Sequence, residues 1–180
     1  MRVITGTAKG KRLKTPEGLL TRPTAERVKE AVFSSIQFEI QQSKFLDLFA
    51  GSGQMGIEAL SRGATTAVFV DSRREACKLV SENLKLAGFE KQGKVIQSDY
   101  MTFLKGCHEK FDIIFLDPPY AEVFLENSLK SITEIDILAD CGIIICERPA
   151  DKLQDIDIPG LTRVKDHKYG KTWVTLFRKE

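Results

Sequence analysis

Four residues in the second half of the chain combine hydrogen-bond acceptors with an aromatic ring. They are Asp117-Pro118-Pro119-Tyr120, and they directly follow an apolar run at 113–116. The prolines hold the backbone rigid and supply no N–H donors, while the Asp117 carboxylate and the Pro118 carbonyl both accept hydrogen bonds. Tyr120 offers a face on which a nucleobase can stack. The tetrapeptide therefore predicts a site for an exocyclic amine, whose two N–H groups fit two converging acceptors.

Such an arrangement suits transfer of a methyl group to the amine nitrogen. Two acceptors draw the nitrogen toward tetrahedral geometry, so that its lone pair points at an incoming methyl group, and positioning is the main contribution to the rate. The proton can leave afterwards, so Asp117 need not be a strong base. The predicted catalytic residues are Asp117, Pro118 and Tyr120.

A glycine-rich segment at 47–53 predicts a cofactor that contains a nucleoside. Its sequence is D-L-F-A-G-S-G, and with Gly56 it completes the pattern G-x-G-x-x-G. Asp71 ends the next apolar run, where a carboxylate can accept hydrogen bonds from both hydroxyls of a ribose. The alternative for the glycines is a plain tight turn.

Asp47 favours S-adenosylmethionine over a dinucleotide as this cofactor. A carboxylate four residues before Gly51 would repel a pyrophosphate but attract the ammonium group of S-adenosylmethionine. A hydrogen bond from Asp47 to the loop backbone is an alternative that is compatible with this role. A nicotinamide enzyme would also need a second domain, for which we expect no room in 180 residues.

Asp99 follows the third apolar run and allows two interpretations. It can accept a hydrogen bond from the adenine amine, with Tyr100 beside the ring, or it can cap a helix that begins at Tyr100. The predicted cofactor-binding residues are Asp47, Ala50, Gly51, Gly53, Asp71, Ser72, Asp99 and Tyr100.

The elements that must position these residues alternate along the chain. Apolar runs at 45–49, 67–70, 95–96, 113–116 and 143–146 are expected to be strands, and amphipathic segments at 54–61, 73–86 and 123–132 are expected to be helices. This alternation predicts an α/β fold with a mostly parallel sheet covered on both faces. Residues 161–166 and 172–177 predict a terminal antiparallel strand pair. Ligands bind at the carboxyl ends of strands in such sheets, which would bring the two loops together.

Positive charge gathers near the N-terminus. Residues 1–30 hold eight Lys or Arg against three Glu, whereas the whole chain has a net charge of only +2. Residues 1–23 are expected to form a basic hairpin extension, with strands at 2–6 and 11–14, and residues 24–180 the main domain. Thr24 is expected to cap a helix that runs to about Phe38. Clustered positive charge favours a polyanion such as RNA, with a solvated basic face as the alternative. The predicted RNA-binding residues here are Arg2, Lys9, Lys11, Arg12 and Lys14.

Composition excludes several classes of protein. Hydrophobic residues make up 42% and charged residues 29%, which is typical of a globular domain. No apolar stretch reaches the roughly 18 residues of a membrane span, and the first residues lack the apolar run of a signal peptide, so we expect a cytoplasmic protein with no membrane partner. We also expect a monomer. The four cysteines form no C-x-x-C pair and no histidine lies at zinc-finger spacing, which favours reduced thiols and no metal.

The chain resembles the class I S-adenosylmethionine-dependent methyltransferases and, within them, the RsmD-type 16S rRNA guanine-N2 methyltransferases. The resemblance covers nearly the whole chain. It rests on R-V-I-T-G-T-A-K-G-K-R-L near the start, R-P-T-A-E-R-V-K-E-A-V-F at 22–33, D-L-F-A-G-S-G at 47–53, D-P-P-Y at 117–120 and Y-G-K-T at 169–172. The motifs at 47–53 and 117–120 are shared with many amino-methyltransferases, whereas the string at 22–33 and the Y-G-x-T ending point to this family.

The resemblance implies a Rossmann-like, seven-stranded sheet and methylation of the N2 amine of a flipped guanine in 16S rRNA, guanine 966, during small-subunit assembly. It implies that Asp47, Gly51 and Gly53 hold the methionine part of the cofactor, Asp71 the ribose and Asp99 the adenine. It implies that 117–120, Pro119 included, meet the target, and that Arg22 and Thr24 lie near the methionine end or the target, unless they only begin a helix. One departure is T-A-K-G at 7–10, where close relatives have W-R-G-(R/K), so RNA affinity is expected to depend more on charge.

Two other functions stay open at this stage. D-P-P-Y also suits an N6-adenine or N4-cytosine methyltransferase that acts on DNA or another RNA, although DNA enzymes usually carry a recognition domain. A nucleotide-binding or RNA-binding module without catalysis is the alternative of another class. Arg148 and Lys171 could contact phosphate but are expected to be solvated, and Trp173 is expected in the core rather than against a base.

Overall fold

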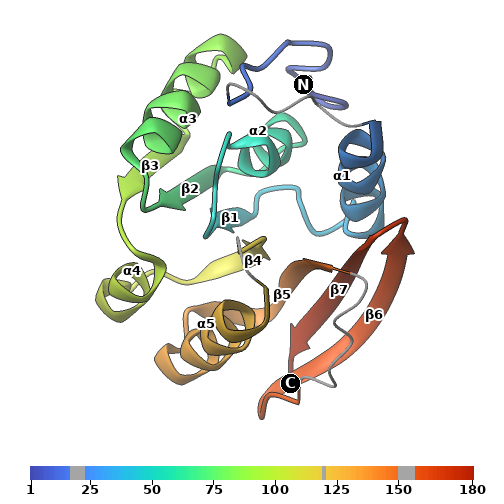
Figure 1. Cartoon of the computed structure of the whole chain (residues 1–180), viewed down its shortest axis with the longest axis vertical. Coiled ribbons are helices and arrows are strands. Elements are labelled where there is room, and N and C mark those ends of the chain that lie inside the picture. Colours follow the sequence, from blue (N-terminus) through green and yellow to red (C-terminus); the bar gives the residue numbers. More distant parts are fainter. Residues whose placement is uncertain (17–22, 119–120, 150–156) are drawn as a thin grey trace.

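The computed structural model describes residues 1–16, 23–118, 121–149 and 157–180 and forms one twisted sheet with helices on both faces (Figure 1). Its elements, in chain order, are α1 (Pro23–Ser35), β1 (Lys44–Asp47), α2 (Gln54–Ser61), β2 (Thr66–Asp71), α3 (Arg74–Ala87), β3 (Gly93–Gln97), α4 (Tyr100–Gly106), β4 (Phe111–Leu116), α5 (Ala121–Ile135), β5 (Leu138–Pro149), β6 (Leu161–Tyr169) and β7 (Thr172–Lys179).

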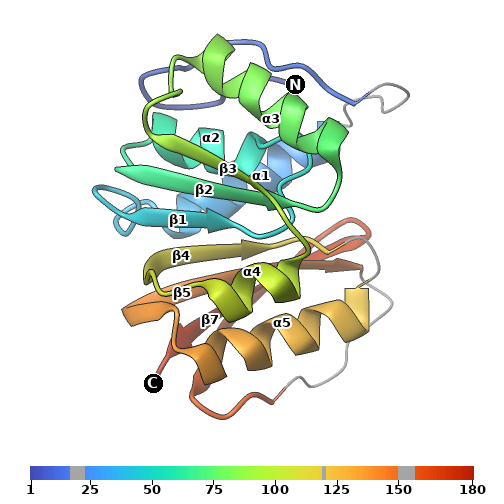
Figure 2. The ribbon, with the colours of Figure 1, turned by 90° about the vertical axis from the view of Figure 1, so that its left-hand side faces the viewer.

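The strand order is β3-β2-β1-β4-β5-β7-β6. The first five strands are parallel, and β7 runs antiparallel to both β5 and β6. The predicted α/β class and the terminal antiparallel pair are therefore confirmed. Because β1 and β4 are parallel neighbours, the loops that follow them leave the same edge of the sheet (Figure 2).

Two apolar clusters, one on each face, hold the sheet between its helices. The first joins the sheet to α1, α2 and α3 through side chains such as Phe33, Ile57 and Val80. The second joins it to α4 and α5 through side chains such as Leu104 and Leu129. Strand residues alternate between the clusters because successive side chains point to opposite faces. The parallel strands are thus buried on both sides, which explains their nearly continuous apolar runs.

Helix α1 differs from the prediction at both ends. It begins at Pro23, so Thr24 lies inside its first turn rather than capping it. Proline suits the first helical position because its φ is already helical and its missing N–H has no partner there. The helix ends at Ser35, whose hydroxyl donates to the carbonyl of Val32 at 2.7 Å, instead of continuing to Phe38.

The N-terminal segment folds back on itself as a hairpin, in which the amides of Val3, Gly10 and Leu13 donate to the carbonyls of Lys11, Val3 and Met1 at 3.0, 2.9 and 2.9 Å, but one bridge takes the place of the predicted strands at 2–6 and 11–14. The bridge joins Arg2 and Arg12. Between them the chain folds against the end of α2, where the amide of Thr7 donates to the Ser61 carbonyl at 2.8 Å and that of Ala8 donates to the Ser61 hydroxyl at 3.0 Å. Val3, Ala8 and Leu13 are buried in the first apolar cluster.

A buried ionic network fastens the same segment to the sheet domain. The Glu58 carboxylate accepts hydrogen bonds from the amides of Ile4 and Thr5 at 2.8 and 3.0 Å, and it pairs with Lys29 at 3.4 Å and Arg62 at 2.8 Å. The Lys29 ammonium, which is also buried, donates to the Arg2 carbonyl at 2.7 Å. The segment that holds the basic N-terminal residues is therefore attached to α1 and α2 by buried polar contacts.

The helices and the cysteines in the described ranges bear on two further predictions, the absence of a membrane span and the presence of reduced thiols. None of the helices there has the length and hydrophobicity needed to cross a membrane. All four cysteines are free thiols, as predicted, with Cys146 buried and Cys141 exposed.

Candidate cofactor and target site

One cavity of about 580 Å³ opens at the edge of the sheet where the parallel strands end. Its walls come from the segments that follow β1, β2, β3 and β4 and from the first turn of α5. The residues that line it are Leu48, Phe49, Gly51, Asp71, Ser72, Arg73, Ser98, Asp99, Tyr100, Asp117 and Phe124. The glycine loop and Asp117, which are far apart in the sequence, therefore meet in one space.

The glycine loop has a backbone that only glycine adopts easily. Gly51 and Gly53 have φ angles of +55° and +77°, in the left-handed region. A Cβ at Gly53 would also lie 3.0 Å from Val80, and one at Gly56 would lie 2.3 Å from the Phe69 ring. These glycines let the loop turn sharply over β1 and let α2 pack closely on β2.

Asp71 holds the glycine loop in place. One carboxylate oxygen accepts from the Gly51 amide at 2.9 Å, and the other accepts from the amide and the Nε of Arg73 at 2.9 and 3.1 Å. Arg73 was missed by the sequence reasoning, although it lies only two residues after Asp71. Its side chain is 67% exposed, so moving it off the carboxylate to admit a ribose would cost little.

Asp47 lies beneath the loop, where it is almost fully buried, and it does not reach the cavity wall. Its carboxylate accepts a long hydrogen bond of 3.4 Å from the amide of Gly56. Loss of hydration, together with the charges of Asp117 and Asp71, raises the pKa of Asp47 to about 7. A carboxyl in this state is stabilised as the anion when a cation arrives.

Asp99 caps a helix and also borders the cavity. One of its oxygens accepts from the amides of Met101 and Thr102 at 3.0 and 3.2 Å, which confirms that it is the N-cap of α4. Its place in the cavity wall leaves adenine binding as a prediction.

Three aromatic rings form one end of the cavity. The centroid of the Tyr100 ring lies 5.3 Å from that of Phe49 and 5.6 Å from that of Phe124. Sequence reasoning named only Tyr100. Phe49 was visible inside the loop motif, whereas Phe124 comes from α5 and meets the other two only through the fold. The cluster offers aromatic surface of the kind that an adenine ring can pack against.

Asp117, from the loop predicted to bind the target amine, lines the cavity. Its surface is accessible from the cavity, but the protein around it reduces its hydration enough to raise its pKa to about 6. Pro118 behind it is buried. Pro119, Tyr120 and Arg22 lie outside the described residues, as does the side chain of Thr24.

Glu147, which sequence reasoning missed, belongs to the same acidic group. It lies on β5, is partly buried, and has a pKa raised to about 8 by loss of hydration and by the charge of Asp117. Nothing in the local sequence C-E-R-P marks this residue, because its neighbour Asp117 lies on another strand.

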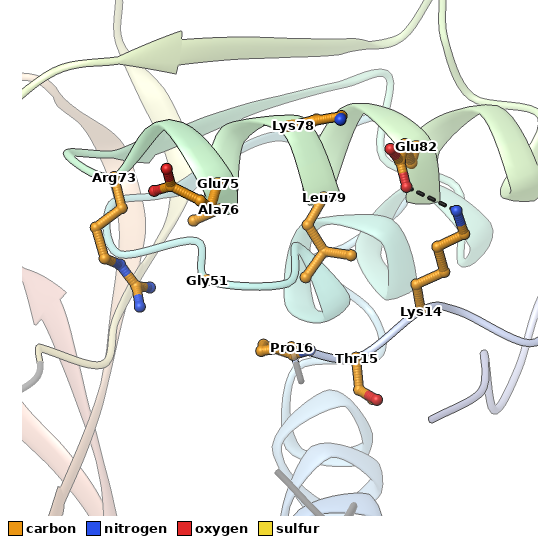
Figure 3. A pocket seen from close by; sticks show the side chains of 10 residues that line it. All are labelled: Lys14, Thr15, Pro16, Gly51, Arg73, Glu75, Ala76, Lys78, Leu79 and Glu82. Atoms are coloured by element: carbon orange, nitrogen blue, oxygen red, sulfur yellow. Dashed lines mark hydrogen bonds and ion pairs between the residues drawn. The ribbon is translucent and has the colours of Figure 1, made fainter. Parts of the chain in front are cut away.

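The five basic residues predicted to bind RNA are all exposed on the N-terminal segment. Arg2 pairs with Glu26 at 3.4 Å and Lys14 with Glu82 at 2.8 Å, whereas the Lys11 ammonium donates to the Ala87 carbonyl at 3.0 Å. A second cavity, of about 540 Å³, lies between residues 14–16 and α3 and shares Gly51 and Arg73 with the first (Figure 3). The basic segment thus borders the glycine loop.

Two residues near the end of the chain differ from their expected roles. Arg148 is buried, donates to the Thr175 hydroxyl at 3.1 Å and pairs with Asp166, so the expected solvated position is wrong. Trp173 is half-buried rather than in the core, and the Lys168 ammonium lies 5.9 Å from the centre of its ring.

Comparison with known proteins identifies the family. The model of the family described as "Conserved hypothetical protein 95" matches residues 1–178. The chain belongs to this family, the RsmD family. YlbH from Bacillus subtilis is 38% identical over 182 residues and 99% of each chain. Ribosomal RNA small subunit methyltransferase D from Haemophilus influenzae is 35% identical over 84% of this chain and 80% of its own length.

A solved structure agrees with the fold of this RsmD-family protein. The protein yhhF from Escherichia coli superimposes with a TM-score of 0.90 and 31% identity, covering 100% of this chain and 98% of its own. The predicted class I fold is therefore confirmed, and the predicted methyltransferase activity agrees with the names of these relatives.

Proposed function

We propose that this RsmD-family protein transfers a methyl group from S-adenosylmethionine to the exocyclic N2 amine of a guanine in 16S rRNA, guanine 966. The name of the Haemophilus relative supports small-subunit rRNA as the substrate. The observation that carries the proposal is the single cavity lined by both the Gly51 turn and Asp117. A donor held by the first would face an amine held by the second.

The residues around the cavity fit S-adenosylmethionine. The left-handed turn at Gly51 and Gly53 leaves room for its amino-acid end, the anion of Asp47 is favoured by its ammonium group, and Asp71 suits its ribose. The aromatic cluster at Tyr100 suits adenine, with Asp99 nearby. When bound, the cofactor supplies a methyl group on a cationic sulfonium, which is the electrophile of the reaction.

Asp117 and Pro118 then orient the amine. The carboxylate and the carbonyl accept one N–H each, so the nitrogen lone pair is directed along the line of displacement. The carboxylate also stabilises the positive charge that develops on nitrogen and can receive the proton once the new N–C bond has formed. Tyr120 and Pro119 are proposed to stack against the flipped base, and Arg22 and Thr24 to border it.

The N-terminal segment is the proposed RNA contact. Residues 1–23 are proposed as the RNA-binding extension and residues 24–180 as the methyltransferase domain. The exposed basic side chains of this extension are Arg2, Lys9, Lys11, Arg12 and Lys14, and residues 14–16 share a cavity with Gly51. Phosphate contacts of this kind supply affinity and register rather than base selectivity. We infer that a monomer binds small-subunit RNA in assembly particles.

Methylation assays on three substrates test the proposal. The purified protein is offered naked 16S rRNA, partly assembled small subunits and duplex DNA, and nucleosides are analysed by mass spectrometry. N2-methylguanosine at one RNA position is expected. N6-methyladenosine or N4-methylcytidine instead would show that the amine has been misassigned, and no methylation of any substrate would favour a binding module.

The Asp117→Ala variant tests the mechanism. It is expected to lower kcat by about 10²–10³, the usual effect of removing one stabilising group at the reacting centre, while S-adenosylhomocysteine still binds within a few-fold of wild type. Unchanged turnover in a folded Asp117→Ala protein would show that this carboxylate does not hold the amine.

A further inference from the structure

The strand register places a second carboxylate beside Asp117. In the parallel pair of β4 and β5, Phe115 lies opposite Ile145 and Leu116 opposite Cys146. The next residues of the two strands are Asp117 and Glu147. Neighbouring strands in a sheet lie about 4.8 Å apart, so these two side chains start from adjacent positions at the edge where the cavity opens.

Side-chain alternation directs Glu147 to the same face of the sheet as Asp117, which comes two residues after Phe115 of the first apolar cluster. Ile145, two residues earlier on β5, belongs to the apolar cluster beneath α1, α2 and α3, whereas Cys146 belongs to the opposite cluster. Glu147 therefore points to the same face as Ile145. Its partner on β7, Val174, is buried in that first cluster as well.

The electrostatics of the site agree with this placement. The charge of Asp117 raises the pKa of Asp47 on β1 and also that of Glu147 on β5. Asp117 thus lies between the two, in the order of their strands in the sheet. Within the described part of the chain, no hydrogen bond or ion pair engages the Glu147 carboxyl, although it is partly buried. Partial burial of a carboxyl that has no hydrogen-bond partner costs free energy, unless a ligand provides N–H donors for it.

The Watson–Crick edge of guanine provides these donors. Its N2 amine lies next to the N1–H group, so two donors stand side by side. Adenine and cytosine instead present a ring nitrogen with a lone pair next to the amine, which a carboxylate would repel.

We propose that Glu147 selects guanine by accepting a hydrogen bond from N1–H while Asp117 and Pro118 hold the N2 amine. The proposal rests on the function proposed above and adds the residue that sets base selectivity. The two N–H donors and the positive charge of the methyl donor both favour the ionised form of Glu147 in the complex. No covalent step involves Glu147, so the proposal concerns recognition alone.

The test uses an RNA fragment in which the target guanosine is replaced by 2-aminopurine riboside. This base keeps the N2 amine but has a lone pair at N1. Assays run at pH 8.5, above the pKa of about 8 that Glu147 has in the free protein. The measured quantity is the ratio of kcat/KM for the guanine substrate to kcat/KM for the 2-aminopurine substrate.

The wild type is expected to prefer guanine by at least about 100-fold, since a site built around a hydrogen bond rejects a base that lacks the donor. Glu147→Gln keeps the size of the side chain, and its amide N–H can donate to the N1 lone pair, so the preference is expected to fall at least about tenfold. Glu147→Asp, which retains the carboxylate, and Glu90→Gln, at an exposed position after α3, should keep the wild-type ratio or most of it.

The outcomes separate this inference from the proposed function. If the wild type makes N2-methylguanosine and Glu147→Gln shows the same ratio, the inference is overturned while the proposed function stands. If the wild type makes no N2-methylguanosine, both are overturned. A merely structural role of Glu147 would lower kcat/KM for both substrates equally and leave the ratio unchanged, which also counts against the inference.

Discussion

Replacing Asp47 by Asn should make the stability of the cofactor-free protein fall less as pH rises, while weakening cofactor binding. Asp47 is buried and its pKa is raised from 3.8 to about 7. A carboxyl whose pKa is higher in the folded state favours folding in its protonated form, so the wild type loses stability as pH rises from about 4 to about 7. Each unit of pKa difference corresponds to about 1.4 kcal/mol, which makes roughly 4 kcal/mol the upper limit of this loss.

The asparagine side chain carries no charge and avoids the loss, but its buried amide brings a separate cost of about 1–3 kcal/mol if its N–H groups lack partners. That cost does not change with pH. The informative quantity is therefore the difference in stability between Asp47→Asn and wild type at pH 8 minus the same difference at pH 4.5. Allowing for relaxation of the site, we expect a change of about 2 kcal/mol in favour of the variant, or roughly 4–8 °C in Tm for a chain of this size.

Thermal unfolding at both pH values, with and without S-adenosylhomocysteine, measures these effects. This product carries the same ammonium group as the methyl donor, and its affinity for wild type should rise with pH up to about 7 and then level off, because ionised Asp47 is the binding form. The variant should bind about 10- to 100-fold more weakly at pH 8 and show a flat profile, since a pair of opposite charges about 6 Å apart near a protein surface is worth roughly 2–3 kcal/mol. Asp140→Asn, at an exposed position near the opposite end of β5, is the control. An equal stability difference at both pH values would show that the ionisation of Asp47 does not destabilise the fold.

Two further predictions concern the N-terminal segment. Changing Lys9, Lys11 and Arg12 to Glu should weaken RNA binding and make log K less steep against log salt by about 2, at roughly 0.7 per phosphate contact; an unaltered slope in a binding titration would place the RNA elsewhere. Glu58→Gln should lower the free energy of unfolding by about 3–5 kcal/mol, because Lys29 would be left buried without its counter-charge, and a urea midpoint equal to that of wild type would contradict the role given to this network.

Features that depend on neighbours in the sequence could be predicted well. The apolar runs at 45–49 and 113–116 mark strands because burial on both faces of a parallel sheet demands apolar residues at successive positions. The glycines at 51 and 53 mark a left-handed turn because other residues are strained there. The cap at Asp99 was left open beside adenine binding, and its hydrogen bonds show that one carboxylate can serve α4 and still border the cavity.

Features that depend on contacts between residues distant in the sequence could not be predicted from the sequence. The hairpin pairing is limited to residues 1–3 and 10–13 because Glu58 and Ser61, more than fifty residues away, accept hydrogen bonds from the amides of Ile4, Thr5 and Ala8. Arg148 is buried because Asp166 and Thr175 approach it from the neighbouring strands.

The sequence by itself determined the class of fold, and it predicted a glycine turn for a nucleoside, a rigid acceptor pair for an amine and a basic segment for a polyanion. Each of these is written in residues that are adjacent in the chain. Only the tertiary structure decided that Asp47, Asp117 and Glu147 share one face at one edge of the sheet, and that their pKa values are raised to about 7, 6 and 8. The pKa of a group depends on its hydration and on the charges around it, and in this site strands that are distant in the sequence determine both.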